Sequence, residues 1–201
     1  MNTPAGLASP AFSAVILAGG RSTRMGRDKA FLKFHGRPLL ARQIALARAL
    51  GPVEVLISGR ANADFTEFGC PVIHDRVPDA GPLAGIAAAL ENARAPLVLV
   101  LAVDLPHLTP AVLERVLATA GASRGVVPRL VGRVEPLAAL YPRCATALAG
   151  EQLARHRYAV REFAQLCEQA GWVRFLDLPS EWAGAFANWN SPADVARRPL
   201  A

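Results

Sequence analysis

An α/β fold with a mostly parallel sheet and helices on both faces is predicted by two features of the 201-residue sequence. Apolar runs of strand length alternate with stretches of helical periodicity, and this alternation is typical of β-α-β units. Connections between parallel strands are right-handed, which favours a doubly wound sheet sandwich. A hydrophobic content of 52% is enough for a sizeable core in a single domain.

The elements of the first two thirds of the chain follow from these patterns. The predicted strands are residues 14–17, 53–57, 72–73, 97–103 and 125–127. The predicted helices are 38–50, 82–93 and 110–120. Each of the three begins with proline, which fits a first turn because its missing N–H would have no partner there. Thr109 precedes the third helix and is expected to be its N-cap.

The alternation becomes looser after residue 130, but further elements are predicted. Residues 134–141 and 172–176 have strand patterns, and residues 145–156 and 160–170 have helical ones. The sequence contains no repeat, low-complexity tract or linker that would divide it. We therefore expect residues 1–12 to form a loose leader and residues 13–201 a single domain.

The charge balance favours anionic partners. Twenty-two basic and 16 acidic residues give a formal net charge of +6. The basic residues are scattered, aromatic residues make up only 6%, and no RNP, homeodomain or zinc-finger pattern occurs. We therefore expect a phosphate-rich small substrate rather than nucleic acid.

Compartment and membrane association are also constrained by the sequence. Cys70, Cys144 and Cys167 form neither a disulfide framework nor a C-x-x-C metal pair, which favours the reducing cytoplasm. The longest strongly apolar run, residues 97–103, is far shorter than the roughly 20 residues that a membrane-spanning helix needs. No membrane partner is expected.

The segment AVILAGGRSTRMGRDKAFL, residues 14–32, points to phosphate binding. An apolar strand ends in Gly19-Gly20, and Arg21, Arg24 and Lys29 follow. Glycines let backbone N–H groups approach an anion, and basic side chains neutralise it. The spacing matches neither a Walker A loop nor the dinucleotide fingerprint. Because 20 of the 22 basic residues are arginines, a lysine in this loop suggests that a compact ammonium is wanted there.

Polar residues follow the predicted strands at the edge where α/β proteins bind ligands. Asp104 comes directly after the most apolar strand, and a carboxylate there can hold Mg²⁺ together with substrate phosphates. Its alternative role is to cap the next helix, for which Thr109 is better placed. Asp75 and Ser58 follow two other strands. A carboxylate such as Asp75 can accept from both N1–H and the N2 amino group of guanine, or it can simply cap a loop.

The glycine segment resembles the signature L-x-G-G-x-S-x-R-M-G-x-D-K of nucleotidyltransferases, and it is most similar to that of the molybdenum cofactor guanylyltransferases. Relatives that use CTP typically have Ala-Ala-Gly where this chain has Ala18-Gly19-Gly20. Further matching segments extend the resemblance over residues 13–197. They are GPLAGI at 81–86, LAVDLP at 101–106, VEPLAALY at 134–141 and NWNSPADV at 188–195.

The resemblance implies a Rossmann-like nucleotidyltransferase fold and a Mg²⁺-dependent enzyme. The enzyme would transfer GMP from GTP to the terminal phosphate of molybdopterin and release pyrophosphate. The implied catalytic residues are Lys29, Asp104 and Arg21, and Asp104 is the implied metal ligand. The implied nucleotide-binding residues are Leu17, Ala18, Gly19, Gly20, Arg24, Lys29, Ser58, Asp75 and Asp104. Asn188 and Asn190 are the implied acceptor-binding residues, with Asx-turn chemistry as the alternative.

Several alternatives remain open from the sequence. Ser58 stands where the family often has asparagine; a serine can still form a hydrogen bond, but it has a shorter reach and no amide. The GPLAG segment either faces the nucleotide with its helix N-terminus or begins a closely packed helix. The reaction could use CTP or a sugar-phosphate acceptor. A non-catalytic nucleotide-binding protein is a further alternative, although Lys29 and Asp104 argue against it. Other cofactor-biosynthesis proteins are possible partners.

Overall fold

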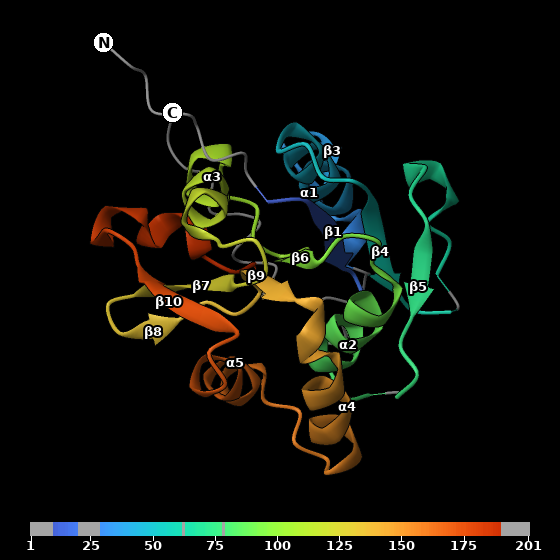
Figure 1. The fold of residues 1–201 in the computed structure, drawn as a ribbon. Helices are drawn as coiled ribbons and strands as arrows, with labels where there is room; N and C mark the ends of the chain where they lie inside the picture. The colour runs from blue at the N-terminus through green and yellow to red at the C-terminus, as the bar shows by residue number, and fades with distance from the viewer. Residues whose placement is uncertain (1–9, 20–28, 62, 78, 190–201) are drawn as a thin grey trace.

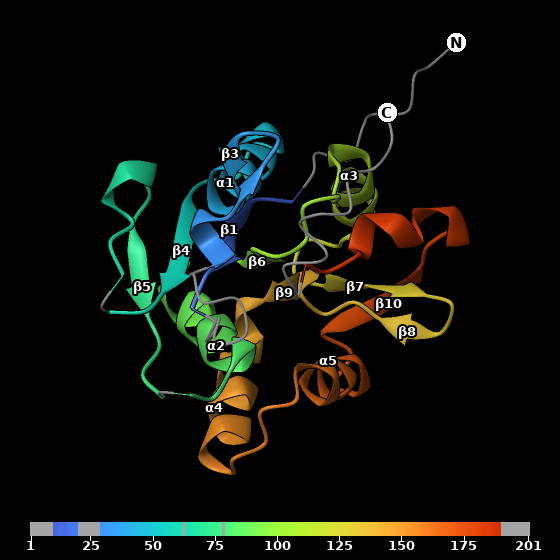
Figure 2. The same cartoon turned by 180° about the vertical axis from the view of Figure 1, so that it is seen from behind.

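One twisted sheet runs through the computed structural model, which describes residues 10–19, 29–61, 63–77 and 79–189. Eight of the strands form this sheet, in the order β10-β7-β9-β6-β1-β4-β5 with β8 paired to β7. They are β1 (Phe12–Leu17), β4 (Val55–Gly59), β5 (Val72–His74), β6 (Leu97–Ala102), β7 (Gly125–Leu130), β8 (Arg133–Val134), β9 (Ala138–Pro142) and β10 (Val173–Asp177). β5 and β10 lie at opposite ends of the sheet in Figures 1 and 2.

The sheet is mixed but mostly parallel. β1 lies between β4 and β6 and is parallel to both, and β4 is also parallel to β5. On the other side β9 is antiparallel to β6 and β7, while β10 is again parallel to β7. The predicted α/β class is therefore confirmed, and β9 is an antiparallel strand inserted within it.

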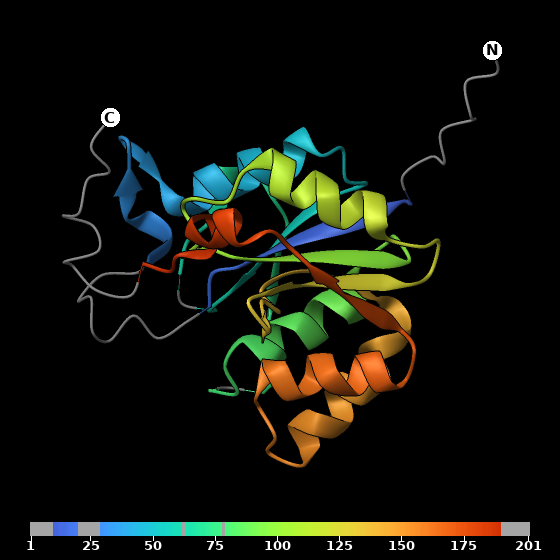
Figure 3. The same ribbon diagram turned by 90° about the vertical axis from the view of Figure 1, so that its left-hand side faces the viewer.

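Helices cover both faces, as a doubly wound sandwich requires. They are α1 (Leu39–Ala49), α2 (Pro82–Asn92), α3 (Pro110–Thr119), α4 (Thr146–Ala154) and α5 (Val160–Gln169). Figure 3 shows α1 and α3 on one face and α2, α4 and α5 on the other. Along β1, Ile16 packs into the core on the α1 side, whereas Val15 and Leu17 pack into the core on the α2 side. The all-apolar strand sequence thus reflects burial on both faces.

The structure corrects several predicted boundaries. The predicted strand over 134–141 is two strands, β8 and β9, because the chain turns at Glu135, whose carbonyl accepts from the Ala138 N–H. Val53 lies before β4 and is 57% exposed. Phe12, assigned to the leader, is buried and begins β1. Thr109 is the N-cap residue of α3, but its side chain makes no capping hydrogen bond.

A small hairpin that the sequence analysis did not predict precedes α1. β2 (Lys33–Phe34) pairs antiparallel with β3 (Arg37–Pro38). The two turn residues, His35 and Gly36, both have positive φ angles, 47° and 77°. Two consecutive positive φ values are characteristic of a type I′ hairpin turn, in which glycine is favoured at the second position. Over the residues that the structure describes, no helix is long and apolar enough to cross a membrane.

Candidate functional site

The carboxyl ends of β1, β4 and β6 meet at one edge of the sheet and bring three predicted site segments together. Leu17 is in register with Ser58 of β4 and with Ala102 of β6. Just beyond, the Ala18 N–H donates to the Ser58 carbonyl (2.8 Å), and the Val103 N–H donates to the Leu17 carbonyl (3.2 Å). The chain before the glycine loop is therefore fixed between the Ser58 and Asp104 segments.

Lys29 and Asp104 form an ion pair at this edge. Lys29 Nζ donates to Asp104 Oδ2 at 2.9 Å, and the two side chains are 21% and 20% exposed. Lys29 begins a short 3₁₀ turn, η1 (Lys29–Phe31), whose Ala30 is fully buried. The ion pair is thus partly accessible to solvent, while the residue next to Lys29 is packed in the core. An ammonium and a carboxylate side by side can contact a phosphate chain and the cation that accompanies it.

The segment containing Asn188 also reaches this place. The Trp189 N–H donates to the Asp104 carbonyl at 3.0 Å. The Trp189 indole is buried, with its ring centroid 5.1 Å from that of Phe34 in the hairpin. Asn188 is adjacent to this anchor and is exposed. The structure therefore brings the predicted acceptor segment next to the Lys29–Asp104 pair.

Ser58 and Asp75 form a second polar group at the same edge. The Ser58 hydroxyl donates to Asp75 Oδ1 at 3.2 Å, and Ser58 is buried. A Cβ atom on Gly19 would lie 3.7 Å from Asp75 Oδ2, so the backbone after β1 passes close to this carboxylate. Burial raises the pKa of Asp75, and the Ser58 hydrogen bond and the charge of His74 oppose this shift. The site offers a half-buried carboxyl group whose position is fixed by a neighbour.

The GPLAG segment begins α2, and its last glycine packs against the site. Gly81 is the N-cap residue with φ at 67°, and Pro82 opens the helix. A Cβ atom on Gly85 would lie 2.5 Å from Ser58 Oγ and 2.9 Å from Leu17 Cδ2. Only glycine allows α2 to approach β1 and β4 so closely. The close-packing alternative for this segment is thus supported by the structure.

Asp104 is the carboxylate that lies beside Lys29 and could hold a metal ion. Within the described ranges, no group of three or more His, Cys, Asp or Glu side chains is arranged to hold a metal. Asp104, which is 20% exposed beside Lys29, suits Mg²⁺, because this ion is bound through one or two carboxylates and substrate phosphates. Asp104 fits this requirement.

Four of the predicted site residues lie outside the described part of the chain, and one residue near the site was not predicted. Gly20, Arg21, Arg24 and Asn190 lie outside the described residues. The sequence analysis missed Gln43, a buried side chain of α1 whose Nε2 donates to the Leu105 carbonyl at 2.6 Å. The signal was a polar residue on the apolar face of a predicted helix, which is uncommon without a partner.

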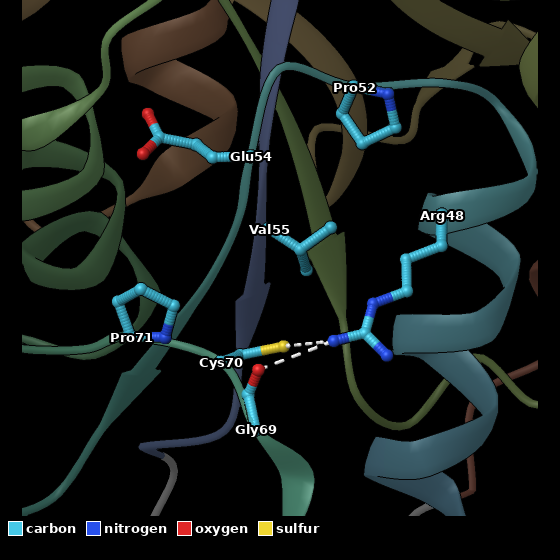
Figure 4. A pocket seen from close by; sticks show the side chains of 7 residues that line it. All are labelled: Arg48, Pro52, Glu54, Val55, Gly69, Cys70 and Pro71. Atoms are coloured by element: carbon cyan, nitrogen blue, oxygen red, sulfur yellow. Dashed lines mark hydrogen bonds between the residues drawn. The ribbon is translucent and has the colours of Figure 1, made fainter.

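A pocket of about 310 Å³ lies elsewhere, at the start of β4 and the end of α1 (Figure 4). Arg48 of α1 lines it and donates to the Gly69 carbonyl (3.4 Å) and to Cys70 Sγ (3.3 Å). Val55, the first residue of β4, also lines it. This pocket is therefore at the opposite end of β4 from Ser58 and is separate from the candidate site.

Known proteins share both the sequence and the fold. The sequence is 37% identical to that of a probable molybdenum cofactor guanylyltransferase from Opitutus terrae, over 93% of this chain and 94% of that protein. A similarly named protein from Pyrococcus horikoshii is 32% identical over 90% and 96%. The crystal structure of molybdopterin-guanine dinucleotide biosynthesis protein A from Archaeoglobus fulgidus superposes with a TM-score of 0.70, at 21% identity, covering 92% of this chain and 95% of that one.

The family assignment rests on most of the chain. The model of the MobA-like NTP transferase domain matches residues 14–170, which include the ends of β1, β4 and β6 and both Lys29 and Asp104. The resemblance found in the sequence and the observed nucleotidyltransferase fold agree with this match. The chain therefore belongs to the family of MobA-like NTP transferases.

Proposed function

We propose that this protein transfers GMP from GTP to the terminal phosphate of molybdopterin. A phosphate oxygen of the acceptor attacks the α-phosphorus of GTP, the bond from that phosphorus to the bridging oxygen breaks, and pyrophosphate leaves. The Lys29–Asp104 pair at the carboxyl edge of the sheet is the observation that carries the proposal. The names of the relatives, which are molybdenum cofactor guanylyltransferases, support the choice of nucleotide and acceptor.

The proposed chemistry relies on positioning and charge. The acceptor phosphate is already an anionic nucleophile, so no strong general base is needed. Lys29 binds the phosphate chain of GTP and offsets its charge, and Asp104 would hold Mg²⁺. When bound, Mg²⁺ neutralises charge that develops on the phosphate oxygens. Arg21 and Arg24 are proposed to hold the leaving pyrophosphate. Together these groups lower the barrier through electrostatic preorganisation.

Base recognition is assigned to the second polar group of the edge. Asp75 as a carboxylate can accept from N1–H and the N2 amino group of guanine. Ser58 holds one of its oxygens by donating across 3.2 Å. The backbone at Gly19 passes beside this carboxylate, and we propose that the Leu17–Gly19 backbone contributes to base recognition. Cytosine presents one amino donor beside an acceptor, so it would leave the carboxylate only partly paired.

The acceptor is proposed to bind on the side of Asn188 and Asn190. Trp189 anchors this segment to Asp104 through its N–H, so an acceptor contacting Asn188 would lie near the reacting phosphorus. The three cysteines are free thiols, which fits a reducing compartment, and we propose that the reaction takes place in the cytoplasm.

The proposal is tested by measuring pyrophosphate release and dinucleotide formation with Mg·GTP, with and without molybdopterin. We expect both products only when the acceptor is present. Asp104→Asn should reduce the rate by about 100-fold or more, the scale on which loss of one charge-stabilising group slows an enzyme. Glu151→Gln is the control, because this exposed carboxylate on α4 pairs with Arg155, the residue after the helix. Normal turnover in Asp104→Asn would refute the role of Asp104, and absence of dinucleotide with the native protein would refute the proposed function.

A further inference from the structure

The turn that follows β6 is held by donors from distant parts of the chain. Strand pairing ends here, so the backbone carbonyls of this turn need other partners. Three consecutive carbonyls have them: that of Asp104 accepts from the Trp189 N–H (3.0 Å), that of Leu105 from Gln43 Nε2 (2.6 Å) as well as from the Leu108 N–H within the turn (3.3 Å), and that of Pro106 from Arg42 Nε (2.6 Å). The residue proposed to hold the metal is thus at the start of a turn fixed at three successive points.

Gln43 is an unusual residue for its position. It is fully buried on the face of α1 that carries Leu39, Leu40 and Ala47, all of them also fully buried. Its Oε1 has no hydrogen-bond partner among the described residues, and an unpaired buried oxygen is costly. An apolar side chain of similar size would avoid this cost. The amide's contribution therefore lies in its other end, the Nε2 donor to Leu105.

Two of the three donors, Arg42 and Trp189, are also connected to one another. The Arg42 guanidinium lies over the Phe34 ring, with its carbon 5.0 Å from the ring centroid. Phe34 in turn packs edge-on against Trp189. Arg42 and Trp189, which bind the two ends of the turn, are thus joined through Phe34. Gln43 binds the carbonyl between the two that Arg42 and Trp189 bind.

α1 also fixes the other member of the ion pair. The Leu39 N–H at the start of α1 donates to the Leu32 carbonyl at 2.8 Å, and the Leu32 N–H donates to the Lys29 carbonyl at 3.1 Å. The 3₁₀ turn that carries Lys29 is therefore attached to α1 by two successive hydrogen bonds. Both the Lys29 turn and the turn after Asp104 are therefore attached to α1.

We propose that Gln43 is a positioning residue: by holding the Leu105 carbonyl, its buried amide fixes the direction in which Asp104 presents its carboxylate to Lys29 and to Mg·GTP. Gln43 itself touches neither of those groups in this role. This inference rests on the proposed function, because it assumes that Asp104 binds a divalent cation together with GTP. Groups that orient metal ligands commonly change metal affinity or activity by about 10- to 100-fold when removed.

The test compares Gln43→Met with Gln152→Met. Methionine keeps the volume but cannot donate. Gln152 is the matched control, since it is also buried, on α4, with an Oε1 that has no partner among the described residues. Mn²⁺ binding in the presence of GTP, without acceptor, is measured by electron paramagnetic resonance. We expect about 10- to 100-fold weaker Mn²⁺ binding for Gln43→Met, together with a loss in kcat and a higher KM for Mg·GTP, because metal and nucleotide bind together. Gln152→Met should keep the native values.

Native Mn²⁺ binding and native kcat in folded Gln43→Met would overturn the inference, as would an equal loss in Gln152→Met. If the native protein binds Mn²⁺ with GTP but forms no dinucleotide, the proposed function fails while the binding comparison still decides the role of Gln43. Absence of Mn²⁺ binding in the native protein overturns both. If Gln43→Met does not fold, Gln43→Asn retains an amide with a shorter reach and should weaken Mn²⁺ binding in the same direction.

Discussion

Lys29 Nζ lies 2.9 Å from Asp104 Oδ2, although the two residues are 75 positions apart in the chain. Lys29 follows the glycine loop after β1, and Asp104 follows β6, the strand beside β1. The parallel pairing of these strands places both residues at the same edge. The two groups that the sequence pattern singled out for phosphate and for metal are therefore direct neighbours.

Because the two side chains are in direct contact, the size of the cationic group at position 29 should matter. Lys29→Arg should recover only part of the activity that Lys29→Ala loses, because the planar guanidinium is wider than an ammonium and binds carboxylates with two nitrogens. An arginine would hold Asp104 in a fork and draw it away from the metal. The measurement is kcat/KM for GTP in the two variants and the native protein. Full activity of Lys29→Arg would show that a positive charge alone is sufficient.

Base choice should depend on Asp75. In Asp75→Asn the amide can no longer accept from both N1–H and the N2 amino group of guanine. ITP lacks that amino group, so its use should fall less than the use of GTP. Buried hydrogen-bonding sites discriminate strongly because a wrong ligand leaves polar groups unpaired. The ratio of kcat/KM for GTP to that for ITP should therefore decrease in the variant. An unchanged ratio would show that Asp75 does not contact the base.

The same substitution should change how stability depends on pH. Burial raises the pKa of the Asp75 carboxyl group above its value in the unfolded chain, so the folded state binds the carboxyl proton more tightly. Its contribution to stability is then fully present below the unfolded pKa and is lost as pH rises through the folded pKa. Asparagine does not titrate. The Tm of Asp75→Asn relative to the native protein should therefore increase between about pH 3 and pH 7, and a constant difference would contradict the assignment.

Close packing at Gly85 should be sensitive to a single methyl group. Gly85→Ala would place a Cβ atom 2.5 Å from Ser58 Oγ, so Ser58 or α2 must move. Overpacking of this kind costs about 1–3 kcal/mol, and displacement of Ser58 should also raise KM for GTP. Gly150→Ala is the control, because a Cβ atom there has nothing within 4 Å in α4 and helical alanine is favoured over glycine. Equal stability of the two variants in urea unfolding would contradict this account of Gly85.

The strands and helices could be predicted because their signals are local. The apolar run of β6 and the prolines that open α2 and α3 are visible in the sequence itself. The direction of β9 could not be read in this way, since an apolar strand has the same pattern whether it pairs parallel or antiparallel. The break at Glu135 was missed for a related reason, because apolar residues continue on both sides of it.

The sequence predicted which residues belong to the candidate site, but not which of them contact one another. Asp104 and Asp75 were identifiable because each follows an apolar strand; Ser58 was expected to follow one as well, but it lies within β4, next to its last residue. Their partners depend on the strand order, which no local pattern encodes: Lys29 for Asp104, and Ser58 for Asp75. Gln43 contributes through contacts 62 residues away in the sequence, so it appeared only as an anomaly on a helix face.

The most direct test of the account is a competition between nucleotides. The native protein is incubated with Mg²⁺, molybdopterin and equal concentrations of GTP, CTP, ATP and UTP, and the dinucleotide products are separated by mass spectrometry. The account predicts that the guanine dinucleotide dominates and that pyrophosphate is released in equal amount. A predominance of the cytosine dinucleotide, or pyrophosphate release without any dinucleotide, would contradict it.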